Sequence, residues 1–166
     1  MKPLVSFVGT SGCGKTTLIE KVIRELVDRG FKVSTIKHDA HDFQMDKEGK
    51  DTWKHKRAGA SAIIISNKSK YAVISDVEEE KSIFELAEML PANTDVIIAE
   101  GFKQELQNKI EVYRSGYSTK LQCREDANLM AIATDCPDDA EVAGFKHLDL
   151  NNTAEIVDFI VANVIK

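Results

Sequence analysis

Short apolar runs alternate with amphipathic stretches along this chain, as in an α/β protein. Residues 4–8 form an apolar run that stops at Gly9, which predicts a buried strand. From residue 15 to 29 apolar side chains recur at spacings of three and four, which predicts a helix that ends before Gly30. Further strands are predicted at residues 32–37, 62–66, 71–75, 95–100, 109–114 and 129–134, and further helices at 52–60, 82–90 and 153–164.

The order of these elements predicts a mostly parallel sheet with helices on both faces. The strands at 62–66 and 71–75 are separated by a short polar segment, which favours a hairpin. No repeat or domain boundary is visible, so we expect one domain over residues 1–166. In such sheets ligands bind beyond the carboxyl ends of the strands. Gly9, His38, Glu100 and Asp135 all follow or end predicted strands, so we expect the chemistry to gather there.

Composition narrows the class of protein. The net charge of −5 argues against a general nucleic-acid-binding protein, which usually has a basic face. The three cysteines show no Cys-x-x-Cys spacing, which is typical of free thiols in a reducing compartment. No apolar run approaches the roughly 20 residues of a membrane-spanning helix. The N-terminal strand leads directly into a glycine-rich loop, which is unlike a signal peptide. We therefore expect a cytoplasmic protein that binds neither nucleic acid nor membrane.

The segment from Gly9 to Thr16 reads GTSGCGKT and matches the phosphate-loop pattern G-x-x-x-x-G-K-[ST] at every fixed position. Its glycines let backbone N–H groups turn toward phosphate oxygens, and the following helix N-terminus favours an anion. In this pattern Lys15 bridges the terminal phosphates and the Thr16 hydroxyl ligates Mg²⁺. The fold class is therefore α/β, a three-layer P-loop NTPase fold.

A second apolar strand, DVIIAE, ends in an acidic residue as a Walker B strand does. Glu100 stands at the exit of this strand, where a carboxylate can hold the metal or polarise an attacking water. Asp95 opens the same strand and is expected at the opposite edge of the sheet. Glu100 is thus the predicted catalytic and metal-binding carboxylate.

Base recognition has one candidate and one misleading motif. Residues 67–70 read NKSK and lack the aspartate of the guanine-reading N-K-x-D motif. Asp135 ends a later core strand, and its carboxylate could accept from guanine N1–H and N2–H₂ or serve only as a polar strand end. His38 and His41, with Asp39 and Asp42, offer donors for a metal but no closed ligand set, so phosphate or substrate contact by a polar loop is favoured.

Several blocks together resemble the molybdopterin-guanine dinucleotide biosynthesis adaptor family, MobB. The loop alone would be unspecific, but the blocks occur in the family's order and cover most of the chain. This chain departs from the family at Ala40, where a further His is frequent, and at Asn152, where an acidic residue is frequent. The blocks are GTSGCGKTT (9–17), IKHDAHDF (36–43), DKEGKDTWKHKRAGA (46–60), EGFK (100–103), KIEVYR (109–114) and ATD (133–135).

The resemblance implies binding of GTP with Mg²⁺, slow GTP hydrolysis at most, and a homodimer. It also implies a partnership with the molybdenum cofactor guanylyltransferase, which joins GMP to molybdopterin, and with the molybdopterin cofactor itself. Glu100 is implied at the metal and Asp135 at the base. The phosphate-binding residues implied are Gly9, Gly12, Cys13, Gly14, Lys15, Thr16 and Thr17, and those of the adjoining face are Lys37, His38, Asp51, Lys54 and Lys103.

Two other functions are compatible with the phosphate loop. A small-molecule kinase using ATP has the right size, but such kinases need an arginine-rich lid, and after Gly101 only Arg114 and Arg124 occur. An autonomous GTPase switch is disfavoured because N-K-x-D and a strand-borne D-x-x-G motif are missing. We therefore favour the GTP-binding accessory protein.

Overall fold

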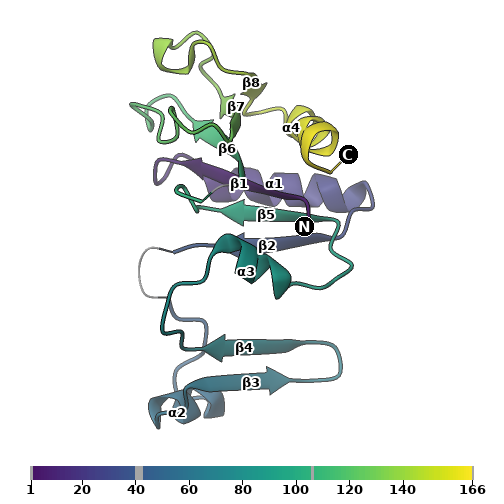
Figure 1. Ribbon diagram of the computed structural model, residues 1–166, viewed down its shortest axis with the longest axis vertical. Coiled ribbons are helices and arrows are strands. Elements are labelled where there is room, and N and C mark those ends of the chain that lie inside the picture. Colours follow the sequence, from purple (N-terminus) through teal and green to yellow (C-terminus); the bar gives the residue numbers. More distant parts are fainter. Residues whose placement is uncertain (1, 40–42, 106, 166) are drawn as a thin grey trace. The chain divides into compact units, whose positions relative to one another are not determined.

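The computed structural model describes residues 2–39, 43–105 and 107–165 (Figure 1). Their contacts divide the chain into two compact units, of which one comprises residues 39–81 and the other the chain on either side of it. No change in composition marks either border in the sequence. Each unit is described by itself.

The larger unit contains a six-stranded sheet in the order β2-β5-β1-β6-β7-β8, in which every neighbouring pair is parallel. The strand that leads into the glycine-rich loop, β1, therefore lies in the interior of the sheet between β5 and β6. This buries β1 on both faces and explains why it is apolar throughout. The strands are β1 (Leu4–Gly9), β2 (Val33–Lys37), β5 (Val96–Glu100), β6 (Asn108–Tyr113), β7 (Leu129–Thr134) and β8 (His147–Asp149).

Helices cover both faces of this sheet, as the sequence predicted. On one face α1 (Lys15–Asp28) and α4 (Thr153–Ile160) pack together over a core that includes Val5 and Phe7 of β1. On the other face α3 (Ile83–Glu88) packs over β2, β5 and β1, where Leu4 and Ile97 are buried. Beyond β1 that second face is covered by irregular segments, since Leu121 and Val142 bury Tyr113 and Ile132.

The structure contains two short elements that were not predicted, and its last helix ends earlier than predicted. The three-residue strand β8 and the 3-10 turn η1 (Ala140–Val142) were not predicted, because a segment of three residues is too short to show a period. The last α-helix, α4, ends at Ile160 and continues as a π-helical segment, η2 (Val161–Ile165). None of the described helices is long and apolar enough to cross a membrane.

The smaller unit consists of α2 (Asp51–Arg57) and an antiparallel hairpin of β3 (Ala62–Ser66) and β4 (Tyr71–Ser75). The predicted hairpin is thus confirmed. The Asn67 side chain accepts hydrogen bonds from the backbone N–H groups of Ser69 and Lys70 and so closes the turn. Lys56 ties α2 to the hairpin, because its ammonium bonds the Ala60 carbonyl at 2.9 Å and the Asp76 carboxylate at 2.5 Å.

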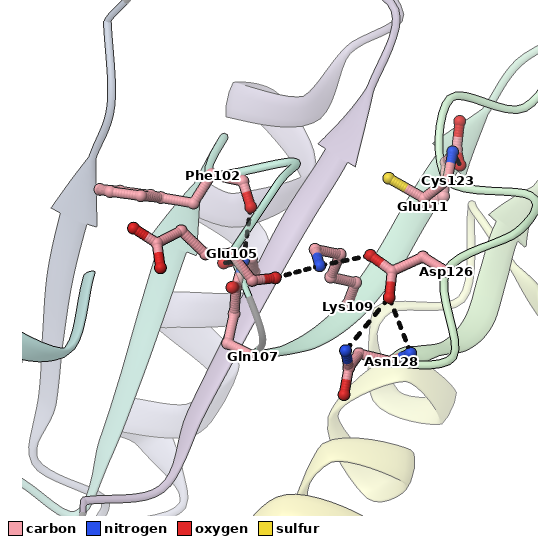
Figure 2. Close-up of polar contacts among 9 residues, drawn as sticks. Phe102, Glu105, Gln107, Lys109, Glu111, Cys123, Asp126 and Asn128 are labelled. Carbon is pink, nitrogen blue, oxygen red and sulfur yellow. Dashed lines mark hydrogen bonds and ion pairs between the residues drawn. The ribbon is translucent and has the colours of Figure 1, made fainter. Parts of the chain in front are cut away.

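A buried ion pair holds an irregular segment against β6 (Figure 2). The Lys109 side chain is fully buried, and its ammonium donates to the Glu105 carbonyl and to the Asp126 carboxylate, the latter at 2.5 Å. Asp126 also accepts from the Asn128 backbone N–H at 2.8 Å. Burial opposes ionisation of Asp126, but the bonds from Lys109 and Asn128 outweigh it and lower the pKa of this carboxyl.

Glu111, a carboxylate of β6 itself, holds the same segment, which runs between β6 and β7. Glu111 is buried and accepts from the backbone N–H groups of Gln122 and Cys123 at 2.6 and 2.9 Å. Burial raises the pKa of the Glu111 carboxyl, although those two bonds act in the opposite direction. Burial likewise raises the pKa of the Cys123 thiol to about 11, which keeps it protonated at neutral pH. The irregular segment after β6 is therefore held by charged side chains of the sheet.

We expect Asp126→Ala to lower the free energy of unfolding by roughly 3–5 kcal/mol, because it leaves the buried Lys109 ammonium without its carboxylate. Lys109→Met fills a similar volume without a charge and should cost clearly less. The double variant should recover part of the loss caused by Asp126→Ala. Urea denaturation of the three variants measures this, and equal losses without recovery would contradict the role of the pair.

Candidate functional site

The glycine-rich loop connects β1 to α1 through left-handed backbone at three glycines. Gly9, Gly12 and Gly14 have φ of 136°, 79° and 93°, a region that other residues adopt only with strain. A Cβ on Gly9 would lie 2.5 Å from the Val112 carbonyl oxygen of β6, whereas a Cβ on Gly12 would meet nothing within 4 Å. Gly9 is therefore required by close backbone packing, and Gly12 by backbone conformation alone.

The side chains of the loop separate into buried and accessible ones. Cys13 is fully buried, and its thiol contacts the Val112 carbonyl at 3.5 Å, so it can offer a ligand only its backbone. The Lys15 ammonium lies over the loop and donates to the carbonyls of Gly9 and Thr10 at 3.2 and 2.8 Å. Lys15 has no carboxylate partner among the described residues. Its charge is thus available to an anion in the loop.

The carboxylate that ends β5 reaches the first turn of α1. Because β5 pairs directly with β1, Glu100 lies beside Phe7 in register. The Thr16 hydroxyl donates to the two carboxylate oxygens of Glu100 at 3.0 and 3.3 Å. Two oxygens at adjacent corners of a Mg²⁺ octahedron lie about 2.9 Å apart, given metal–oxygen distances of roughly 2.0–2.1 Å. Thr16 and Glu100 thus fit Mg²⁺ in both donor type and spacing.

Asp135 follows β7 at the same edge of the sheet and is positioned by the end of β6. One carboxylate oxygen accepts from the Ser115 backbone N–H at 2.9 Å, and the other lies 3.6 Å from Nε of Arg114. A cavity of about 450 Å³ extends from Asp135 along the carboxyl ends of β7 and β8 to Asn151 and Glu155. Asp135 therefore borders a space large enough for a small organic group.

Arg114 lies beside the glycine-rich loop, although it was not among the residues predicted for the site. Its Nη1 lies 2.9 Å from the position of a Cβ on Gly14, so the guanidinium rests against the phosphate loop. Arg114 also borders a small hollow with Thr17 and Lys21 of α1. Arg114 ends the KIEVYR block of the sequence, but the sequence does not show that β6 pairs with β1. That pairing brings Arg114 to the loop.

The remaining predicted residues divide between the two units. Lys37 pairs with Glu100 in register, and the His38 backbone N–H donates to the Glu100 carbonyl at 3.0 Å, so both lie at the exit of β5. Lys103 bonds the Gln122 side chain at 3.3 Å. Asp51 and Lys54 belong to α2 in the smaller unit, where the Lys54 ammonium lies 3.8 Å from a carboxylate oxygen of Asp51. His41 and Asp42 fall outside the described residues.

In this parallel sheet, the buried strand β1 leads through a glycine-rich loop into α1. The neighbouring strand β5 ends in a carboxylate. These features define an α/β protein with a P-loop-like fold. The sequence profile of the family described as Molybdopterin guanine dinucleotide synthesis protein B, MobB, matches residues 4–135. The match covers well over half of the chain. The chain therefore belongs to the MobB family.

Individual relatives agree with this assignment. The molybdopterin-guanine dinucleotide biosynthesis adapter protein of Haemophilus influenzae is 40% identical over 159 residues, covering 95% of this chain and 87% of the relative. The Escherichia coli protein of the same description is 35% identical over 165 residues, covering 97% and 93%. A crystal structure of molybdopterin-guanine biosynthesis protein B superposes with a TM-score of 0.73 at 28% identity, covering 96% and 98%.

We expect Gly9→Ala to destabilise the protein more than Gly12→Ala. Both changes place a side chain in a left-handed conformation, which costs roughly 1–2 kcal/mol. Only the Gly9 variant also drives a methyl group into the Val112 carbonyl, and crowding of this kind costs roughly a further 1–3 kcal/mol. Thermal and urea denaturation of the matched pair compare the two costs. Equal destabilisation would show that β6 can move away from Gly9.

Proposed function

We propose that this protein binds GTP with Mg²⁺ and acts as an accessory protein in molybdenum cofactor biosynthesis, where it assists the attachment of GMP to molybdopterin. The observation that carries the proposal is the hydrogen bond between Thr16 and Glu100, at 3.0 Å, at the end of the loop over which the Lys15 ammonium lies. It joins a phosphate-loop hydroxyl to the carboxylate of the adjacent strand at the spacing that Mg²⁺ needs. The adapter descriptions of the relatives support the pathway.

In this proposal the loop holds the phosphates through the backbone N–H groups from Gly12 to Thr17, and Lys15 neutralises their charge. Mg²⁺ held by Thr16 and Glu100 supplies further charge neutralisation. Arg114 adds a cation beside Gly14, where it can exchange its distant contact with Asp135 for a phosphate oxygen. Lys37, His38 and Lys103 extend the polar surface at the exit of β5.

Asp135 is the proposed reader of the base. The Ser115 N–H occupies one of its oxygens, and among the described residues the other oxygen has only the distant Arg114 guanidinium as partner. A carboxylate accepts well from guanine N1–H and N2–H₂ but repels the acceptor N1 of adenine. The cavity beside Asp135 provides the space that a base requires.

The proposed partners are the guanylyltransferase and molybdopterin, with the protein working in the cytoplasm as a homodimer. Ile64, Ile65, Tyr71 and Val73 of the hairpin are exposed, and an isolated two-stranded ribbon is marginally stable, which supports its burial in an assembly. Hydrolysis of GTP is slow at most in this proposal, in keeping with an adapter. Fast transfer of phosphate from ATP to a small metabolite would instead favour a kinase.

We expect Lys15→Ala to abolish measurable GTP binding while the protein stays folded. The variant loses a charge-assisted contact worth roughly 1.5–3 kcal/mol or more, and the side chain is only partly buried, so folding should be unaffected. Isothermal titration of GTP into the folded variant measures the loss, and circular dichroism verifies the fold. Unchanged affinity would remove the phosphate-loop assignment.

We expect GTP to bind more tightly than ATP, and Asp135→Ala to narrow this difference mainly by weakening GTP. When ATP binds, adenine offers no N–H donor to the Asp135 carboxylate, which stays unpaired. This unpaired carboxylate is the physical source of the preference. Competition of both nucleotides against a fluorescent GTP analogue tests the wild type and the variant. A preference for ATP in the wild type would contradict the guanine assignment, whereas a retained GTP preference in the variant would remove only the role of Asp135.

A further inference from the structure

A larger cavity, of about 630 Å³, lies wholly within the smaller unit. It is bordered by residues 43–46, by one side of α2, and by the β3–β4 hairpin with residues 75–77. Its volume is within the range of small-molecule sites, roughly 300–1,000 Å³. None of the residues proposed above for binding GTP or Mg²⁺ borders it.

The α2 side of the cavity presents an aromatic ring and a cation. The Arg57 guanidinium lies 5.4 Å from the ring centroid of Trp53, one helical turn earlier. The neighbouring Lys56 is neutralised by Asp76 at 2.5 Å, whereas Arg57 has no carboxylate partner in the described part of the chain. Arg57 is therefore held over an aromatic surface with its charge available to an anion.

The segment before α2 adds apolar surface and an acceptor. Phe43 and Met45 border the cavity and are 62% and 78% exposed, which is unusual for such large apolar side chains. Asp46 borders it too, and one of its oxygens accepts from the Lys47 N–H at 2.8 Å and the Thr52 hydroxyl at 3.1 Å. The other oxygen of Asp46 is buried and accepts no hydrogen bond from the described residues. A buried acceptor without a donor needs explanation, and a ligand N–H would supply the donor.

We propose that this cavity binds a planar pterin that carries an anionic group. The bicyclic ring would lie against Trp53 and Phe43, and the anion would pair with Arg57. The Asp46 oxygen that has no donor among the described residues would accept from the N–H edge of the 2-amino-4-oxopyrimidine ring. This inference rests on the proposed function for its choice of a pterin. Guanine has the same donor edge, so the experiment includes both ring systems.

Trp53 is the only tryptophan of the chain, so its fluorescence reports directly on this cavity. Pterin-6-carboxylate should quench it saturably, and calorimetry should give the same affinity. Arg57→Ala should weaken binding roughly tenfold, the loss of one charge-assisted contact. Asp46→Asn should weaken binding of pterin-6-carboxylate but not of quinoxaline-2-carboxylate, a planar anion without the donor edge. Lys68→Ala removes an exposed charge at the hairpin turn of the same unit and should change nothing.

Three results would overturn the inference: no binding of pterin-6-carboxylate, equal binding by the Arg57 variant, or tighter binding of GMP than of the pterin at Trp53. A change of oligomeric mass in Arg57→Ala, without pterin binding by the wild type, would show that a second copy of the chain covers the cavity. GTP binding is measured on the same samples with Lys15→Ala as reference. GTP binding without pterin binding refutes only this inference, and pterin binding without GTP binding refutes only the proposed function.

Discussion

The pairing of β1 with β5 on one side and β6 on the other is the constraint on which the candidate site depends. It places Glu100 of β5 against Thr16, and Arg114, directly after β6, against Gly14, so both flanks of the glycine-rich loop are charged. The same packing leaves no room for a side chain at Gly9, whose missing Cβ lets the Val112 carbonyl approach. A shift of either neighbouring strand would remove a charged group from the loop.

The second face of the sheet shows how irregular segments are positioned without helices. Beyond β1 that face of β6 carries Lys109 and Glu111, which are buried and paired with the segment that crosses over them. Charged groups cost free energy to bury, but hydrogen bonds of this kind have a strict geometry. That geometry holds residues 122–126 of the segment after β6, and the start of the same segment supplies the Ser115 N–H that bonds Asp135. Stability in the interior and precision at the site are thus linked through β6.

The two compact units carry different kinds of chemistry. The larger unit combines the glycine-rich loop with Lys15, the Glu100 carboxylate and Asp135, which together form the proposed nucleotide site. The smaller unit contains a cavity with an indole, an available guanidinium and a carboxylate, which suit a planar organic anion. In the two proposals made above, the nucleotide is bound by the larger unit and the pterin by the smaller one.

Sequence alone determined the features that depend on local patterns. The glycine-rich loop, the buried strands and the hairpin follow from spacing and residue type, as do the roles expected of Lys15 and Thr16. Glycine conformation and apolar periodicity are local properties. Strand order is not local, so only the tertiary structure decided that β6 lies beside β1 and that Arg114 reaches Gly14. The same holds for the burial of Lys109 and Glu111 and for the cavity around Trp53, since each arises from contacts between segments distant in sequence that no periodic pattern encodes.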